Sequence, residues 1–179
     1  LTQIPDEFLR KVTAELGVEL PSLGSYGVGN IFLPKEKKER ENYIEQIKKI
    51  VENENLKILA LRDIPVNNNG LGYSVKPTEP FHLQMFVASN EELSDQNALE
   101  RKLFVTRKNI YRIFLGDQSK PLNDFYMCSL SSKTLLYKGM LLSDQLAEYF
   151  LDLNDPLFKS ALALVHQRFS TNTFPSWKL

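Results

Sequence analysis

The chain is short of the residues that build covalent or metal-bound frameworks. Among its 179 residues it has one cysteine and two histidines. A single cysteine cannot form an internal disulfide, which is typical of proteins from a reducing compartment. Two isolated histidines without a paired cysteine or an acidic cluster do not have the spacing of a metal site. We therefore expect no bound metal in this chain.

Long apolar runs and an excess of one charge are also missing. No apolar stretch approaches the roughly 20 residues that a membrane-spanning helix needs. Lysine plus arginine and aspartate plus glutamate each number 22, so the formal net charge is zero. This balance gives no electrostatic basis for binding nucleic acid or a membrane surface. With 42% hydrophobic residues, the chain can bury one substantial core. We expect a soluble intracellular globular domain.

Neither end has the features of a natural terminus. The chain opens at Leu1 without an initiator methionine or a targeting sequence. It stops at Leu179 directly after Trp177 and Lys178, with no turn and no charged tail. We therefore expect residues 1–179 to be an internal segment of a longer protein, truncated at both ends.

The hydrophobic pattern predicts helices that alternate with strands in one α/β domain. Helical periodicity and end signals predict helices over residues 6–16, 35–55, 94–114 and 143–150. In the third of these, the inward side chains are expected to be Leu99, Leu103, Thr106, Ile110 and Ile113. Strands are expected over residues 25–33, 56–64 and 81–88, in a hairpin of 125–129 with 134–138, and over 161–165. Residues 65–80 are expected to form a polar loop.

Two local patterns favour a structural interpretation over a catalytic one. Gly27 and Gly29 lie in an apolar strand, and the third glycine of a dinucleotide-binding fingerprint is missing. We expect these glycines to permit close backbone approach within a sheet. Cys128 lies in an alternating strand, and neither histidine is its neighbour in sequence. We interpret it as a buried structural thiol.

The last fifteen residues contain the strongest candidate site. The apolar run 161–165 is expected to form a buried strand, and Arg168, Thr171 and other hydrogen-bonding residues follow it directly. A buried strand that delivers a guanidinium and several donors to one place suits a small carboxylate ligand. The alternative is an ordinary strand end, with Arg168 in a surface salt bridge and Thr171 as a local cap. The residue types alone leave both interpretations open.

The same segment, His166-Gln-Arg-Phe-Ser-Thr-Asn-Thr-Phe-Pro-Ser-Trp177, resembles the signature of the glutamine amidotransferase domain of glutamate synthase, in its large-subunit or ferredoxin-dependent form. Four further blocks resemble this family in the same order: Tyr26-Gly-Val-Gly29 with Phe32-Leu-Pro34; Arg62-Asp-Ile-Pro-Val66 with Leu71-Gly72; Glu100-Arg-Lys-Leu103 with Arg107-Lys108; and Phe125-Tyr126 with Ser129-Leu-Ser-Ser-Lys-Thr134 and Tyr137-Lys-Gly-Met140. The resemblance covers nearly the whole chain.

The resemblance implies an α+β fold of the N-terminal-nucleophile hydrolase type, a four-layer αββα sandwich. Residues 1–179 would be part of a single type 2 glutamine amidotransferase domain. In such domains a cysteine at the mature N-terminus, activated by its own α-amino group, attacks the side-chain amide of glutamine and forms a thioester. An asparagine side chain and a glycine N–H stabilise the oxyanion. The released ammonia passes through an internal tunnel to a flavin site, where 2-oxoglutarate becomes glutamate.

The resemblance also assigns residues. In related amidotransferases an Arg-x-x-Thr element grips the α-carboxylate of glutamine, and here it falls on Arg168 and Thr171, with Phe169 as a wall of the pocket. A planar guanidinium matches a carboxylate bidentately. The nucleophilic cysteine is expected before Leu1, and Cys128 does not take its place. We therefore expect no catalytic residue in the segment and no glutaminase activity from the isolated chain.

Cofactors and partners follow from the same resemblance. FMN and a 3Fe-4S cluster are expected in the parent enzyme, with neither bound by this segment. The electron donor would be ferredoxin or an NAD(P)H-dependent small subunit. The Met127-Cys128 link favours the ferredoxin-dependent form, hence the plastid stroma or a cyanobacterial cytoplasm, with a bacterial cytoplasm as the alternative. Two other functions stay open: an amidotransferase with another ammonia acceptor, and a non-catalytic glutamine-binding domain.

Overall fold

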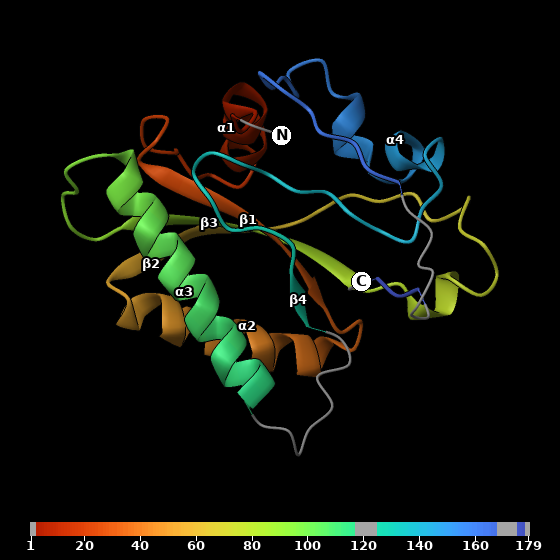
Figure 1. The fold of residues 1–179 in the computed structure, drawn as a ribbon, viewed down its shortest axis with the longest axis horizontal. Helices are drawn as coiled ribbons and strands as arrows, with labels where there is room; N and C mark the ends of the chain where they lie inside the picture. The colour runs from red at the N-terminus through yellow and green to blue at the C-terminus, as the bar shows by residue number, and fades with distance from the viewer. Residues whose placement is uncertain (1–2, 117–124, 168–174, 178–179) are drawn as a thin grey trace.

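The computed structural model describes residues 3–116, 125–167 and 175–177 (Figure 1). The helices are α1 (Asp6–Ala14), α2 (Lys37–Asn53), α3 (Gln96–Gly116) and α4 (Gln145–Tyr149), with 3-10 turns η1 (Lys76–Thr78) and η2 (Leu151–Asn154). The strands are β1 (Tyr26–Leu33), β2 (Leu56–Asp63), β3 (Phe81–Ser89) and β4 (Tyr126–Met127). They form an antiparallel sheet in the order β2-β3-β1-β4.

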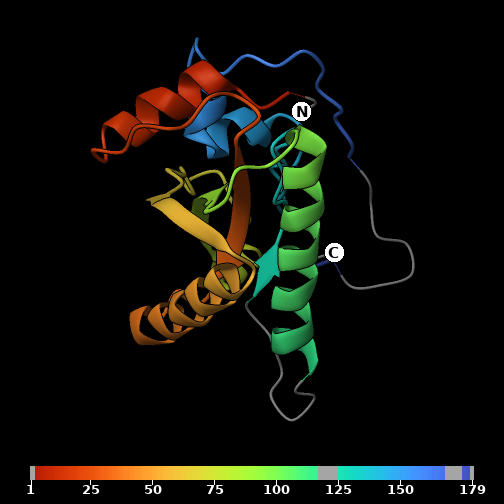
Figure 2. The same cartoon turned by 90° about the vertical axis from the view of Figure 1, so that its left-hand side faces the viewer.

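The sheet is covered on both faces by helices or connecting segments. α2 and α3 pack on one face, and α1 and α4 lie on the other, as the two views at right angles show (Figures 1 and 2). Every residue of β1 is buried. Because side chains alternate across a strand, Ile31 and Met85 join the core under α2 and α3, whereas Val28 and Phe86 join the core under α1. A third cluster surrounds Phe32 at the other end of the second face.

Most of the expected elements are confirmed. Helices α1, α2 and α3 and strands β1, β2 and β3 lie where the periodicity places them, and α4 is a shortened form of the fourth helix. The two glycines of β1 permit the close approach expected of them. A Cβ on Gly27 would lie 2.5 Å from Leu103 Cδ1, and one on Gly29 would lie 2.6 Å from the carbonyl oxygen of Ser129. The mixture of helices with an antiparallel sheet agrees with the α+β class.

The expected hairpin of residues 125–129 with 134–138 is wrong. β4 pairs with Ile31 and Phe32 of β1, and residues 134–138 are not in a described strand. The intervening turn is fixed from outside: the Glu100 carboxylate of α3 accepts hydrogen bonds from the Ser131 hydroxyl and the Ser132 N–H. Because α3 and β1 hold this turn, the following segment runs away from β4 instead of folding back along it.

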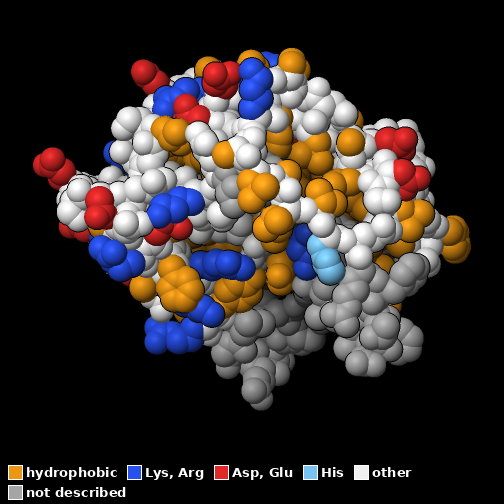
Figure 3. All heavy atoms as spheres, turned by 45° about the horizontal axis from the view of Figure 1, so that its top comes forward, with side chains coloured by type: hydrophobic (Ala, Val, Ile, Leu, Met, Phe, Trp, Pro, Cys, Tyr) orange, Lys and Arg blue, Asp and Glu red, His pale blue; other side chains and the backbone are white. Residues whose placement is uncertain are grey.

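The expectation of a buried strand at residues 161–165 is also wrong. Leu164 is 81% exposed and Val165 is 77% exposed. Figure 3 shows that apolar side chains reach the surface in several places on the face that it presents. An apolar run becomes a buried strand only where neighbouring elements cover it. Among the described residues, no element covers this run. The described residues show one sheet, so the four-layer sandwich stays a prediction.

One expected core position of α3 is displaced by a residue. Leu99, Leu103, Thr106 and Ile110 are buried as expected, but Ile113 is 46% exposed and Phe114 is buried instead. At about 100° per residue, Ile113 and Phe114 lie roughly 50° to either side of the mean direction of these four residues, and Phe114 is the one that packs against Tyr43 and Phe125. Ile113 therefore falls at the edge of the buried face.

Candidate functional site

The residues assigned to glutamine binding, Arg168, Phe169 and Thr171, lie outside the described residues. The structure does describe both flanks of their segment. His166 is exposed on one side, and Trp177 is buried on the other, with 4% of its surface accessible. The sequence motif therefore ends on the folded body of the protein, beside β3.

Trp177 lies in a cluster of aromatic rings at the end of the sheet. Its ring centroid is 5.7 Å from that of His82, 5.7 Å from that of Tyr149 and 6.1 Å from that of Phe32. Gly139 approaches the indole so closely that a Cβ there would lie 2.8 Å from its Cζ3 atom. Rings at these separations pack favourably in edge or tilted arrangements. These contacts fix the indole from several sides.

A buried chain of hydrogen bonds supports two of these rings. His82 Nε2 lies 2.7 Å from the Tyr149 hydroxyl, which donates to Glu79 Oε1 at 2.7 Å. Glu79 Oε2 accepts from Lys35 Nζ at 2.8 Å and from Asn68 Nδ2 at 3.1 Å. The single hydroxyl proton is directed at Glu79, so the tyrosine oxygen accepts from histidine. His82 consequently carries a proton on Nε2.

The electrostatics of this chain agree with a neutral histidine beside an ionised glutamate. Burial lowers the pKa of His82 to about 4. Burial by itself would raise the pKa of Glu79, but hydrogen bonds from Lys35, Tyr149 and Asn68 outweigh it and hold that pKa below its usual value. Burial, together with the Glu79 carboxylate, raises the pKa of Tyr149. At neutral pH the array is therefore fixed, with His82 neutral, Glu79 ionised and the Tyr149 hydroxyl protonated, and no group in it is poised to transfer a proton.

A second buried polar network crosses the same face of the sheet. Arg62 of β2 forms a bidentate pair with Asp152 of η2. The Tyr137 hydroxyl also donates to Asp152, at 2.8 Å. Gln84 of β3 accepts from Arg62 at 3.3 Å and donates to Asn30 of β1 at 3.0 Å. The network joins three strands of the sheet to the segment that follows β4.

The network and the neighbouring contacts bring together blocks that are far apart in the sequence. Arg62 and Tyr137, from two of the blocks that carry the family resemblance, meet on Asp152. Glu100, from a third block, accepts a hydrogen bond of 2.9 Å from Ser131, which belongs to the same block as Tyr137. These residues build the scaffold of the domain, which explains why they occur as blocks outside the ligand motif.

Cys128 behaves as the buried thiol that the sequence predicts. It is 4% exposed, and burial raises its pKa to about 12. A thiol with such a pKa is almost entirely protonated at neutral pH and therefore a poor nucleophile. Within the described ranges no group of three or more His, Cys, Asp or Glu side chains could hold a metal ion. None of the helices described here is long and apolar enough to cross a membrane.

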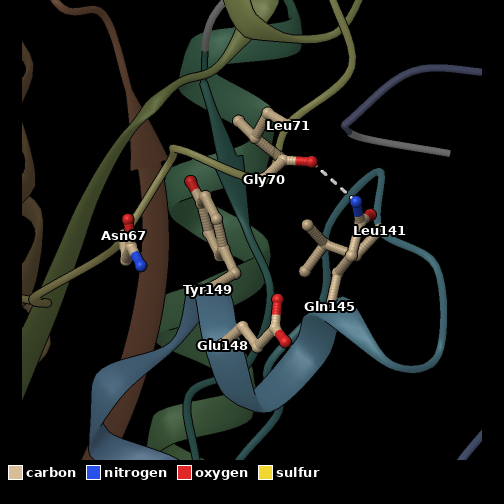
Figure 4. Close-up of a pocket in the computed structure, with 7 residues that line it drawn as sticks. All are labelled: Asn67, Gly70, Leu71, Leu141, Gln145, Glu148 and Tyr149. Carbon is tan, nitrogen blue, oxygen red and sulfur yellow. Dashed lines mark hydrogen bonds between the residues drawn. The ribbon is translucent and has the colours of Figure 1, made fainter.

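A small cleft lies beside Tyr149, between α4 and the loop that precedes η1 (Figure 4). Gln145 closes one side by donating from Nε2 to the carbonyl oxygen of Gly70 at 2.7 Å. The cleft has a volume of about 20 Å³, which is room for roughly one water molecule. The cleft is too small for an amino-acid substrate. Glu79, His82 and Tyr149 thus form a hydrogen-bonded platform, and Trp177, the last residue of the sequence motif, packs against two of its rings.

Sequence reasoning missed the residues of this platform. Glu79, His82 and Tyr149 are not part of a local motif. His82 and Glu79 lie 67 and 70 residues from Tyr149 along the chain. The one signal available was Trp177, which closes the ligand motif and is the only tryptophan of the chain.

Comparison with known proteins gives a consistent result. The family model of class-II glutamine amidotransferases matches residues 1–179. The chain is 40% identical over 178 residues to the glutamate synthase [NADPH] large chain of Bacillus subtilis, covering 99% of this chain and 11% of the relative. It is 36% identical over 179 residues to ferredoxin-dependent glutamate synthase 2 of Synechocystis, covering 100% of this chain and 11% of the relative.

A third similar protein is the glutamate synthase [NADH] of Schizosaccharomyces pombe, 38% identical over 182 aligned residues, covering 99% of this chain and 8% of the relative. The chain thus spans about a tenth of the length of the curated relatives it matches. NADPH, ferredoxin and NADH forms all occur among these relatives.

Proposed function

The chain belongs to the class-II glutamine amidotransferase family, and we propose that it is part of the glutamine-hydrolysing domain of a glutamate synthase, which supplies ammonia for the conversion of 2-oxoglutarate to glutamate. One observation carries the proposal: nearly the whole chain aligns with glutamate synthases, at 40% identity in the Bacillus relative. An amidotransferase with another ammonia acceptor would also match the family model, but the relatives reported above are all glutamate synthases.

In this proposal Arg168 binds the α-carboxylate of glutamine, Thr171 donates a further hydrogen bond, and Phe169 forms a wall of the pocket. The Arg-x-x-Thr spacing and the attachment of the segment through buried Trp177 support the assignment. A bidentate guanidinium–carboxylate pair fixes both the position and the orientation of a small ligand. The nucleophilic cysteine and the oxyanion donors would come from other parts of the parent protein.

The four-layer sandwich is part of the same proposal. We propose that a second sheet, supplied by other parts of the parent, packs on the segments around residue 136 and residues 162–165. Their exposed apolar side chains support this: Leu136 is 44% exposed, Leu162 is 52% exposed and Leu164 is 81% exposed.

The cofactors of the parent, FMN and a 3Fe-4S cluster, would be held elsewhere in it. Iron–sulfur clusters are held chiefly by cysteine thiolates, and this chain has one cysteine, which is buried. The residues present therefore do not fit the cluster. In this proposal the contribution of this chain is to bind glutamine.

We propose ferredoxin as the electron donor, as the name of the Synechocystis relative states for that protein. This donor would place the parent in the plastid stroma or a cyanobacterial cytoplasm. The NADPH-dependent form in a bacterial cytoplasm is the second candidate, favoured by the 40% identity to the Bacillus relative.

Isotope transfer tests the proposal. The protein that carries this chain is supplied with glutamine labelled with ¹⁵N in the side-chain amide, with 2-oxoglutarate, and with reduced ferredoxin, NADPH or NADH in separate reactions. We expect ¹⁵N in the α-amino group of newly formed glutamate, with one of the three donors. Glutamine hydrolysis without use of 2-oxoglutarate would indicate another acceptor. Glutamine binding without turnover would indicate a non-catalytic domain.

A further inference from the structure

We propose that Trp177 is a positioning residue for glutamine binding. In this inference its indole, clamped by His82 and Tyr149, fixes one end of the segment that carries Arg168 and Thr171. The inference rests on the proposed function, because it takes those two residues to be the glutamine ligands.

The two flanks of that segment differ in burial. Residues 161–167 are exposed, with Val165 at 77%, so the described structure gives this flank little anchoring. Trp177 is 4% exposed and contacts rings from β1, β3 and α4. Among the described residues, the buried indole therefore supplies the packing that ties this end of the segment to the sheet.

Hydrogen bonds hold the two rings that clamp Trp177, those of His82 and Tyr149, in a fixed orientation. Tyr149 is hydrogen-bonded on both sides of its hydroxyl, to His82 and to Glu79, each at 2.7 Å. Glu79 is in turn paired with Lys35 at 2.8 Å, from the turn after β1. Two of the rings that contact Trp177 are thus held in orientation by buried polar contacts, including a charge-assisted one. Supporting hydrogen bonds of this kind are what hold a binding site to its productive geometry.

The Trp177 indole is held by the packing of its ring. Among the described residues, Trp177 Nε1 is a buried side-chain donor without a hydrogen-bond partner. Packing of the ring, rather than a hydrogen bond from its nitrogen, therefore keeps it in place. Phenylalanine would retain an aromatic ring without the unsatisfied donor, whereas alanine would remove the anchor.

The connection between Thr171 and Trp177 is short. Trp177 follows Thr171 by six residues. At about 3.3–3.6 Å per residue, such a connection spans at most roughly 20 Å, so a fixed indole limits where Thr171 can lie. Restricting a binding segment before the ligand arrives lowers the entropic cost of binding. Misplacement of a ligand-binding group by about 1 Å can reduce a rate by roughly 100-fold.

The test compares four variants in the complete parent enzyme. Trp177→Ala removes the anchor, Trp177→Phe retains a ring, and Tyr149→Phe removes the hydroxyl that links His82 to Glu79. Phe114→Ala is the matched control, because it truncates a buried aromatic on the opposite face of the sheet. For each, kcat and KM for glutamine are measured beside the rate with ammonia in place of glutamine.

We expect Trp177→Ala to raise the glutamine KM by tenfold to roughly 100-fold while the ammonia-dependent rate is kept. Trp177→Phe should stay close to the parent, Tyr149→Phe should fall between the two, and Phe114→Ala should leave the glutamine KM unchanged. An unchanged glutamine KM in Trp177→Ala would overturn the inference, as would an equal loss of the ammonia-dependent rate.

Two variants help to interpret the result, Tyr149→Phe if Trp177→Ala does not fold and Arg168→Ala to test the ligand assignment separately. If Trp177→Ala fails to fold, Tyr149→Phe decides: a raised glutamine KM supports the clamp and an unchanged one overturns it. Arg168→Ala separates the inference from its premise. If Arg168→Ala impairs glutamine use and Trp177→Ala does not, the positioning role alone fails. If neither variant affects glutamine use, the proposed ligand assignment fails as well.

Discussion

Arg62 and Asp152 face each other through two parallel hydrogen bonds, Nη1 to Oδ2 at 2.8 Å and Nη2 to Oδ1 at 2.7 Å. Their side chains are only 12% and 2% exposed. The pair joins the end of β2 to η2, and Tyr137 donates a third hydrogen bond to the same carboxylate. It therefore holds the segment after β4 against the sheet in a setting that water hardly reaches.

Removing the carboxylate of this pair should be strongly destabilising. Asp152→Ala leaves the Arg62 guanidinium buried without its partner, and such a loss costs about 3–5 kcal/mol. Hydrogen exchange of the β2 and β3 amides in the protein that carries this chain should show the lost protection. Lys49→Ala is the control, because it breaks the exposed Lys49–Glu45 pair of 2.9 Å and should leave protection unchanged. Equal protection in both variants would contradict the structural role of the buried pair.

Alanine substitutions at the glycines should reduce stability by amounts that depend on the atoms around each glycine. Gly29→Ala places a Cβ 2.6 Å from a backbone oxygen, which cannot move without shifting the chain after β4. Gly27→Ala meets the end of the Leu103 side chain, which can rotate. We expect overpacking costs of about 1–3 kcal/mol, larger at Gly29 than at Gly27. Gly70→Ala, whose nearest neighbours lie 3.9 Å away, should be tolerated. Equal thermal stability of the Gly29 and Gly70 variants would refute this ranking.

His82 should make the stability of this region sensitive to acid. Its pKa is lowered by burial from an ordinary 6.5 to about 4, so the unfolded chain binds a proton more readily than the folded protein. Stability should therefore fall as the pH decreases from about 6.5 towards 4, by up to roughly 3 kcal/mol. Protection of β3 amides, corrected for intrinsic exchange, measures this between pH 7 and pH 5. His82→Gln should flatten the dependence, and an identical slope in that variant would argue against a buried neutral histidine.

Cys128 should be unreactive in the folded protein. With a pKa raised by burial to about 12, only on the order of one thiol in 10,000 is ionised at pH 8. We expect iodoacetamide to modify it after unfolding but not before, as peptide mass spectrometry can establish. Incubation with glutamine should leave no thioester on this residue. Rapid labelling of the folded protein, or a glutamyl adduct on Cys128, would contradict the structural interpretation of this thiol.

The elements that local sequence determines were predictable. The repeat of Ile47 and Val51 in α2 and the alternation of β1 each arise from neighbouring residues, and Gly27 and Gly29 indicated close packing before any contact was known. The predicted hairpin of residues 125–129 with 134–138 was wrong because Glu100, which is distant in the sequence, holds the turn between them. The run 161–165 failed because composition records how apolar a segment is, but not what covers it.

The candidate site also has one part that the sequence could not predict and one that it could. The platform of Glu79, His82 and Tyr149 could not be predicted, since its hydrogen bonds join residues 67 and 70 positions apart. The ligand assignment to Arg168, Phe169 and Thr171 came from a contiguous motif, and it stays a prediction because those residues lie outside the described ranges.

The most direct measurement is the glutamine kinetics of Arg168→Ala in the parent enzyme, with Arg168→Lys alongside. Loss of one partner of a charge-assisted pair with the glutamine carboxylate costs about 2–5 kcal/mol, roughly 30-fold or more in kcat/KM. Lysine keeps the charge but not the planar fork, so it should recover only part of the loss. We predict that glutamine-dependent synthesis falls by this factor while the ammonia-dependent rate is unchanged. Unaltered glutamine kinetics in Arg168→Ala would contradict the assignment of this segment as the glutamine-binding element.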